Sequence, residues 1–108
     1  MRLTADIWVS AYLTRLRLSD IPAFVVARGD ATAGAVLVKL NSLDGSACCY
    51  QRSFDLKTGD RKWVVLVEGD EVEVDQSIAK QRGFDPDLWV IEVEDRQGRH
   101  LLDEPGLE

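Results

Sequence analysis

The dipeptide Asp44-Gly45 constrains the fold of this chain more than any other short segment. It separates two stretches rich in strand-forming residues, 35–41 and 47–55. A type I′ turn requires positive φ at both of its central residues, and Asp-Gly is one of the sequences that meets this requirement. The pattern therefore predicts an antiparallel hairpin in the middle of the chain.

Helices and further strands are predicted on both sides of this hairpin. Apolar residues at helical spacing predict a helix over residues 4–19, and start and stop signals predict a second helix over 70–82. Segments rich in β-branched and aromatic residues predict strands over 23–27, 62–67 and 88–93. The order α-β-β-β-β-α-β predicts an α+β fold with a mainly antiparallel sheet of about five strands.

The ends of both helices carry local signals. Thr4 is a preferred capping residue for the first helix, and Asp70 with Glu73 resembles a capping box for the second. Gly83 stands where a left-handed C-terminal cap belongs, and Pro86 prevents the helix from continuing. We therefore expect the second helix to end just before this glycine.

The composition limits the fold and the classes of partner. The 108 residues are 45% hydrophobic and no linker divides them, so we expect a single domain over 1–108 with a loose tail at 103–108. Thirteen basic against 19 acidic residues give a net charge of −6, which repels a phosphate backbone and argues against nucleic acid. No apolar run approaches the roughly 20 residues that cross a membrane, so no membrane partner is expected.

The two cysteines, Cys48 and Cys49, are neighbours in a predicted strand. Successive side chains of a strand point to opposite faces, so these two thiols are poorly placed to bond each other. The sequence contains neither a disulfide framework nor metal-ligand spacing, and we expect no cofactor and no metal. Reduced cysteines favour a cytoplasmic location.

The turns decide which side chains share a face of the sheet. A two-residue turn pairs Lys39 with Tyr50, and a second turn at 58–59 pairs Arg52 with Val65. Trp63 then lies on the same face as these four residues. We expect the two helices to pack mainly on the other, aliphatic face, so this basic and aromatic face needs a ligand or a protein partner. A one-residue slip in either turn would reassign these side chains.

The candidate ligand or interface residues are basic and aromatic: Arg28, Lys39, Tyr50, Arg52 and Trp63. Charge-assisted bonds and stacking from this set would suit an anionic or planar ligand. The glycine-containing loop after Arg28 offers amides that would help to hold an anion, although no helix follows it. The simpler interpretation is that the long cationic side chains lie over apolar surface or pair with acids.

Other polar features have plainer explanations. The acids within 68–75 do not have the spacing of an EF-hand loop, and a helix N-terminus stabilised by its dipole accounts for them. His100 is the only histidine and lies near the end of the chain, without a nucleophile elbow. The predicted strand 47–55 offers Gln51-Arg52-Ser53 where small nucleases have an acid-x-lysine triplet. We therefore assign no catalytic residue, and the weight of the sequence is against an enzyme.

Four segments together resemble a known protein family: 21–30, 34–41, 50–54 and 85–95. Over nearly its full length the chain resembles an alphaproteobacterial family described as domain of unknown function 1491. The resemblance implies a bacterial cytoplasmic protein of about this size. It implies no activity, cofactor or catalytic residue.

Two classes of function follow from these features. The first is a small interaction or structural protein that forms a homodimer through a sheet face or the first helix, or binds another protein. Ile7, Ala11 and Leu18 support it, because they form a second, narrower apolar strip on that helix. The alternative is a module or enzyme that binds a small anionic metabolite on the basic and aromatic sheet face.

Overall fold

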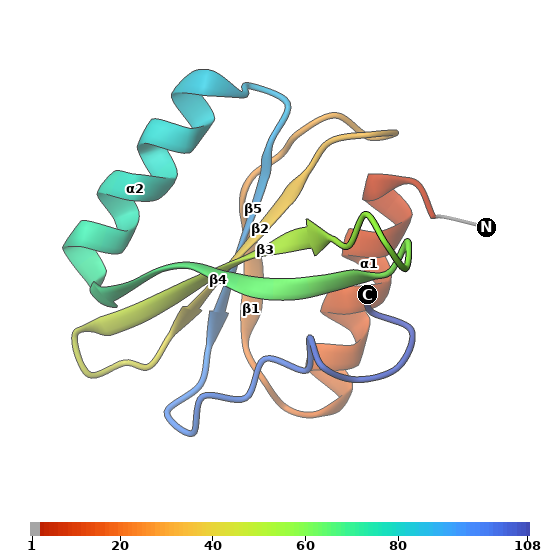
Figure 1. Cartoon of the computed structure of the whole chain (residues 1–108). Coiled ribbons are helices and arrows are strands. Elements are labelled where there is room, and N and C mark those ends of the chain that lie inside the picture. Colours follow the sequence, from red (N-terminus) through yellow and green to blue (C-terminus); the bar gives the residue numbers. More distant parts are fainter. Residues whose placement is uncertain (1–2) are drawn as a thin grey trace.

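The computed structural model describes residues 3–108 and confirms the predicted order of elements. Each predicted helix and strand is present, with ends that differ by three residues or fewer. Figure 1 shows the sheet between the two helices. The elements are α1 (Ala5–Leu18), β1 (Ala23–Ala27), β2 (Val36–Asn41), β3 (Ser46–Phe54), β4 (Arg61–Asp70), α2 (Glu71–Phe84) and β5 (Trp89–Glu94).

The five strands form one sheet in the order β1-β5-β2-β3-β4. β2, β3 and β4 form an antiparallel meander, and β1 pairs antiparallel with β5. The last strand, β5, enters the sheet between β1 and β2 and runs parallel to β2. The sheet is therefore mainly antiparallel with one parallel pair, and β1 and β4 are its edges.

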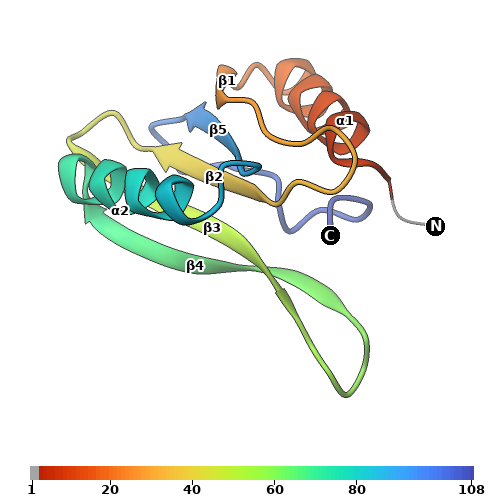
Figure 2. The same ribbon diagram turned by 90° about the horizontal axis from the view of Figure 1, so that it is seen from above.

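The helices lie on opposite faces of the sheet (Figure 2), and the expectation that both cover mainly one face is wrong. α1 packs on alternate residues of the central strands, including Val38 and Ile91. α2 packs on the residues between them, including Leu37 and Val90. All six residues of β2 are buried. A strand covered on both faces loses the polar and apolar alternation that would identify its solvent side.

The hairpin between β2 and β3 is longer than a two-residue turn. Residues 42–45 form the connection, with Leu43 at φ 62° and Gly45 at φ 92°. The side chain of Asn41 accepts a hydrogen bond from the Leu43 backbone at 2.8 Å, which favours this wider turn. Lys39 consequently pairs with Cys49 and not with the neighbouring tyrosine. This one-residue shift moves Lys39 to the α2 face.

The helix termini form fewer capping interactions than the sequence predicted. Thr4 is the N-cap residue of α1, as expected, but its side chain bonds Asp6 and not a backbone amide. Asp70 is the N-cap of α2 without any side-chain cap bond, so the capping box is not formed. Gly83 is helical and has no positive φ, and α2 continues to Phe84. The backbone after Phe84 leaves the helix in an extended conformation.

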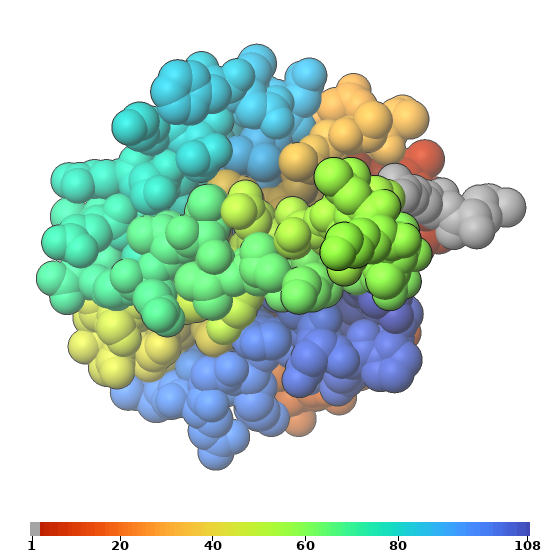
Figure 3. Space-filling model, viewed as in Figure 1, coloured from red at the N-terminus to blue at the C-terminus, as the bar shows by residue number. Residues whose placement is uncertain are grey.

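The C-terminal segment is packed against the body of the protein, in contrast to the loose tail that we expected. Leu107 is 1% exposed in the core on the α1 side. Its carbonyl oxygen accepts a hydrogen bond from Trp63 Nε1 at 2.7 Å, and Arg15 donates to the Pro105 carbonyl at 2.8 Å. Figure 3 shows this segment, in blue, directly against β4, in green.

Candidate functional site

A groove between α2 and the β1 side of the sheet combines apolar walls with a group of charged side chains. α2 contacts mainly β3 and β4, and it covers the β1 side of that face only in part, so that Ala27 of β1 is half-buried. We call the resulting hollow, of about 540 Å³, the β1–α2 groove. Ligand pockets have typical volumes of about 300–1,000 Å³. Its lining residues are Val26, Ala27, Lys39, Glu71, Asp75, Ile78, Ala79, Arg82, Val90 and Glu92.

Lys39 lies at the polar end of the groove and is only 4% exposed. Its ammonium nitrogen is 2.8 Å from Glu71 Oε2, 2.6 Å from Asp75 Oδ1 and 3.2 Å from Glu92 Oε1. We call these three acids the carboxylate cluster. The first two stand one turn apart at the start of α2, and Glu92 stands beside Lys39 in the parallel pair of β2 and β5.

Asn41 completes this network. Its amide nitrogen donates to Glu71 Oε2 at 2.9 Å and to Glu92 Oε2 at 3.2 Å. A lysine ammonium has three N–H donors and an asparagine amide has two, so these five bonds use all five donors. Glu71 Oε1 and Asp75 Oδ2 receive no bond from either residue. The carboxylate cluster therefore has acceptor capacity beyond what Lys39 and Asn41 fill.

The protonation of Lys39 determines what this site can do. Burial alone lowers the pKa of Lys39, but the bonds to Asp75, Glu71 and Glu92 outweigh it and hold the pKa above its ordinary value. The side chain is thus an ammonium ion near neutral pH. A lysine nucleophile must be deprotonated, so the geometry suits binding and not covalent catalysis by Lys39.

The basic and aromatic residues that were predicted to form one site lie on different faces of the sheet. Tyr50, Arg52 and Trp63 lie on the α1 side of the sheet, away from Lys39. The Arg52 guanidinium lies over two indole rings, 4.6 Å from the centre of Trp8 and 4.9 Å from the centre of Trp63. The predicted combination of Lys39 with Arg52 on one face does not occur.

Arg28 lies apart from both groups. Its guanidinium is 5.0 Å from the centre of the Trp89 ring. The indole nitrogen of Trp89 in turn donates to the Asp30 carbonyl at 2.8 Å. Arg28 therefore covers an aromatic ring at the edge of the α1 side, as the simpler interpretation of the long cationic side chains predicts.

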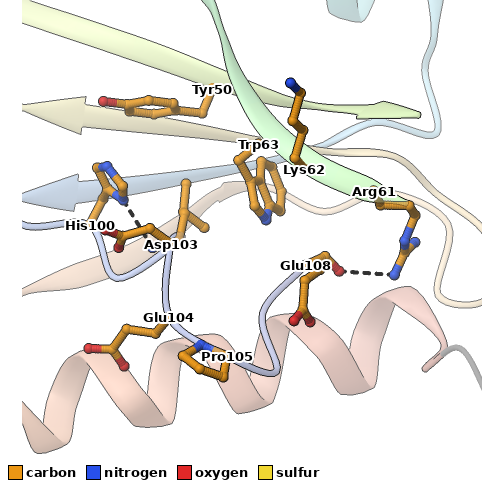
Figure 4. Close-up of a pocket in the computed structure, with 10 residues that line it drawn as sticks. Tyr50, Arg61, Lys62, Trp63, His100, Asp103, Glu104, Pro105 and Glu108 are labelled. Atoms are coloured by element: carbon orange, nitrogen blue, oxygen red, sulfur yellow. Dashed lines mark hydrogen bonds between the residues drawn. The ribbon is translucent and has the colours of Figure 1, made fainter. Parts of the chain in front are cut away.

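A second hollow, of about 500 Å³, lies between the C-terminal segment and the strands β3 and β4. Figure 4 shows Trp63, Tyr50 and His100 around it. Several of its polar groups already hold the C-terminal segment in place. Arg61 donates to the Glu108 carbonyl at 3.0 Å, and His100 Nδ1 accepts from the Leu102 backbone at 2.9 Å. We therefore regard the β1–α2 groove as the stronger candidate site.

The sequence did not predict the carboxylate cluster, because the acids within 68–75 were explained by the dipole of a helix N-terminus and Glu92 was given no role. Two of its members are in the run of acids at the start of α2, and the third is in β5. A signal was present, since Glu71 and Asp75 are four residues apart and share a helix face. The missing step was the parallel pairing of β5 with β2, which sets Glu92 beside Lys39.

Residues 3–108 contain neither a group of side chains suited to a metal ion nor a helix that could span a membrane. No group of three or more histidine, cysteine or acidic side chains is arranged to hold a metal ion there. No helix in this range has the length and apolar character to cross a membrane.

Comparison with known proteins identifies the family. The family model described as "Protein of unknown function (DUF1491)" matches residues 3–103. The chain belongs to the DUF1491 family. No curated protein matches the chain.

Solved structures of alphaproteobacterial relatives agree with the DUF1491 fold described above. A crystal structure of a DUF1491 protein from Caulobacter crescentus is 40% identical, covers 97% of both chains and has a TM-score of 0.83. A DUF1491 NMR structure from the same organism is 41% identical, covers 97% of this chain and 96% of the other, and also has a TM-score of 0.83. A solution structure of a protein from A. tumefaciens is 28% identical, covers 94% and 93%, and has a TM-score of 0.79.

Proposed function

We propose that this DUF1491 protein is a small-molecule binding protein whose β1–α2 groove holds an organic cation with an apolar body. The observation that carries the proposal is the carboxylate cluster at the end of an apolar groove. Three carboxylates against one ammonium leave a net charge of −2 there. A ligand amine or guanidinium would donate to Glu71 Oε1 and Asp75 Oδ2, the two oxygens that Lys39 and Asn41 leave unused.

The apolar body of the ligand would lie along the groove floor. Val26 is 54% exposed and Ala79 is exposed there, and Ala27 is half-buried, so these lining residues offer apolar surface to a ligand. Burial of a hydrocarbon chain against this floor contributes about 25 cal/mol for each Å² of apolar surface removed from water. The charged head group would fix the orientation of the ligand, and the apolar lining would hold its hydrocarbon body.

Arg82 also lines the groove and indicates a narrower class of ligand. It follows Asp75 by seven residues on the same face of α2, which corresponds to about 10 Å along a helix. A ligand with an anionic group about this far from its cationic nitrogen would contact both ends of the groove. We therefore expect zwitterionic molecules of this length to bind more tightly than simple amines.

The experiment is an NMR and calorimetric titration with three ligands of equal chain length: octylamine, octanol and ω-aminooctanoate. Octylamine is expected to shift the backbone signals of residues around the groove, whereas octanol binds at least tenfold more weakly. ω-Aminooctanoate is expected to exceed octylamine, and Arg82→Gln is expected to remove that gain. If octanol binds as well as octylamine, the cationic head has no role and the proposal is wrong.

Matched variants test the contribution of the carboxylate cluster. Asp75→Asn removes one charge of the cluster and is expected to weaken octylamine binding about tenfold. Glu73→Gln is the control, because it removes the same charge from the same helix but does not line the groove. An equal loss in both variants would indicate general electrostatic attraction and would contradict a defined site.

We also propose that the protein acts in the cytoplasm. Cys48 and Cys49 are both free, which supports a reducing compartment. Burial raises the pKa of the Cys49 thiol to about 12, and burial also raises that of Cys48, so neither is a reactive thiolate at neutral pH. Fractionation of cells that express the protein tests this location, and recovery from the periplasm would contradict it.

A further inference from the structure

The outer surface of α1 carries an apolar strip opposite the core. Ile7 is 53% exposed and Leu18 is 77% exposed, and Ala11 and Thr14 lie exposed between them. These four residues follow the spacing i, i+4, i+7 and i+11, so they form one line along the helix. We call them the α1 strip. The buried residues of α1, such as Tyr12 and Leu16, lie on the opposite side of the helix.

The α1 strip is complementary to itself when a second helix runs antiparallel to it. A two-fold axis that passes midway between residues 12 and 13 sets Ile7 opposite Leu18 of a second copy. The same axis sets Ala11 opposite Thr14. Large side chains then meet at both ends of the contact, and small ones meet in the middle, where the helices can approach closely. Contacts that a two-fold axis repeats in this way are typical of homodimers.

The charges beside the α1 strip favour the same arrangement. Asp6 and Arg17 flank the strip on the same side, at opposite ends of the helix. In an antiparallel pair this side of one helix lies beside the same side of the other, so Asp6 meets Arg17 of the second copy twice. The offset between the two positions is about 3 Å along the helix axis, which a long arginine side chain spans. In a parallel two-fold pair the equivalent sides of the two helices lie on opposite sides of the contact, so Asp6 and Arg17 of the two copies would not meet.

We propose that two copies of this protein associate through antiparallel packing of their α1 helices along the α1 strip. The helix has 14 residues and is thus about 21 Å long, so the contact is smaller than a standard protein interface. The expected complex is a weak, reversible dimer. The β1–α2 groove lies on the other side of the sheet and stays open in this dimer.

Sedimentation velocity from about 5 to 500 µM tests this dimer. The wild type is expected to shift from monomer toward dimer over this range, and Leu18→Glu is expected to stay monomeric. Leu18 is mostly exposed, so this change leaves the core intact. Leu56→Glu is the control, because Leu56 is 91% exposed on the turn between β3 and β4. A wild type that is monomeric throughout, or a dimer that Leu18→Glu does not weaken, would overturn the proposal.

A charge exchange tests the antiparallel orientation. Arg17→Glu places two acids beside each other in each half of the contact and is expected to weaken the dimer at least fivefold. The double variant Asp6→Arg with Arg17→Glu restores opposite charges and is expected to recover most of the loss at low salt. Thermal unfolding of each variant shows whether it is folded. A folded double variant that associates no better than Arg17→Glu would exclude this orientation.

Discussion

Lys39 of β2 lies directly beside Glu92 of β5, with 3.2 Å between Lys39 Nζ and Glu92 Oε1. Both side chains project from neighbouring central strands of a sheet that has a helix on each face. Two further acids from α2 reach the same ammonium group. Because an ionised side chain is costly to bury without partners, this contact ties the position of α2 to the pairing of β2 with β5.

Replacement of Lys39 by methionine is expected to destabilise the protein. Lys39→Met keeps most of the side-chain volume but leaves three carboxylates close together without their cation. Loss of one partner of a buried ion pair costs about 3–5 kcal/mol, and the partial exposure of the acids reduces this to roughly 2–3 kcal/mol. Urea unfolding measures the change, with Lys80→Met on the exposed side of α2 as the control. An equal stability of the two variants would show that the network contributes nothing.

Alanine substitutions at two glycines are expected to have opposite effects on stability. A Cβ at Gly29 would meet the carbonyl oxygen of Asp87, so Gly29→Ala is expected to destabilise the protein by more than about 2 kcal/mol. Gly83 is helical with open space around it, so Gly83→Ala is expected to stabilise the protein by roughly 0.5–1 kcal/mol. Thermal unfolding of both variants checks the signs. A stabilised Gly29→Ala variant would mean that this loop does not lie against Asp87.

The sequence predicted the elements of this fold and the antiparallel pairing of β2, β3 and β4, but not the register of these strands or the position of β5. Helical and strand periodicities are local, and the order of helices and strands followed from them directly. The register of β2 depended on one turn, and the hydrogen bond between the Asn41 side chain and the Leu43 backbone widened it. This shift of one residue places Lys39 on the face of the sheet opposite to the other residues of the predicted site. Strand order is a long-range property, so the position of β5 between β1 and β2 had no local signal.

The candidate site depended on these same long-range pairings. The helix dipole was a sufficient explanation for Glu71 and Asp75 in the sequence, and only the pairing of β5 with β2 brings Glu92 to Lys39. The C-terminal segment was expected to be loose because it is short and acidic. The buried side chain and the carbonyl oxygen of Leu107 hold it in place, together with hydrogen bonds from Arg15 and Arg61 to its backbone.

Leu107 is expected to contribute to the stability of the whole protein and not only to its own segment. It is buried in the same core as Trp8 and Leu16, and its carbonyl oxygen binds the Trp63 indole. Leu107→Ala is expected to cost about 2–3 kcal/mol, at the lower end of the range for a buried leucine. Leu56→Ala, on the exposed turn, is expected to change stability by less than about 0.5 kcal/mol. Similar costs in the two variants would show that the C-terminal segment does not pack on the core.

The hydrogen bonds of His100 predict a dependence of stability on pH. His100 Nδ1 accepts from the Leu102 backbone, so protonation at this nitrogen would replace the acceptor with a donor and break the bond. Burial lowers the pKa of His100 below its ordinary value of 6.5, while the charge of Asp103 opposes the shift. The Tyr50 ring, with its centre 4.7 Å away, packs on the imidazole and brings no charge to it.

The sign of the effect follows from the lowered pKa. Below pH 6.5 the unfolded chain binds a proton at His100 more readily than the folded protein does. The stabilisation is therefore complete above this pH and is lost as the pH falls through the folded pKa. NMR titration of the only histidine measures the folded pKa, and urea unfolding at pH 7.5 and 5.5 measures the loss. In His100→Asn the amide oxygen can replace Nδ1 as the acceptor without titrating, so this variant is expected to lose less stability at pH 5.5. An equal loss in both proteins would assign the acid sensitivity to other groups.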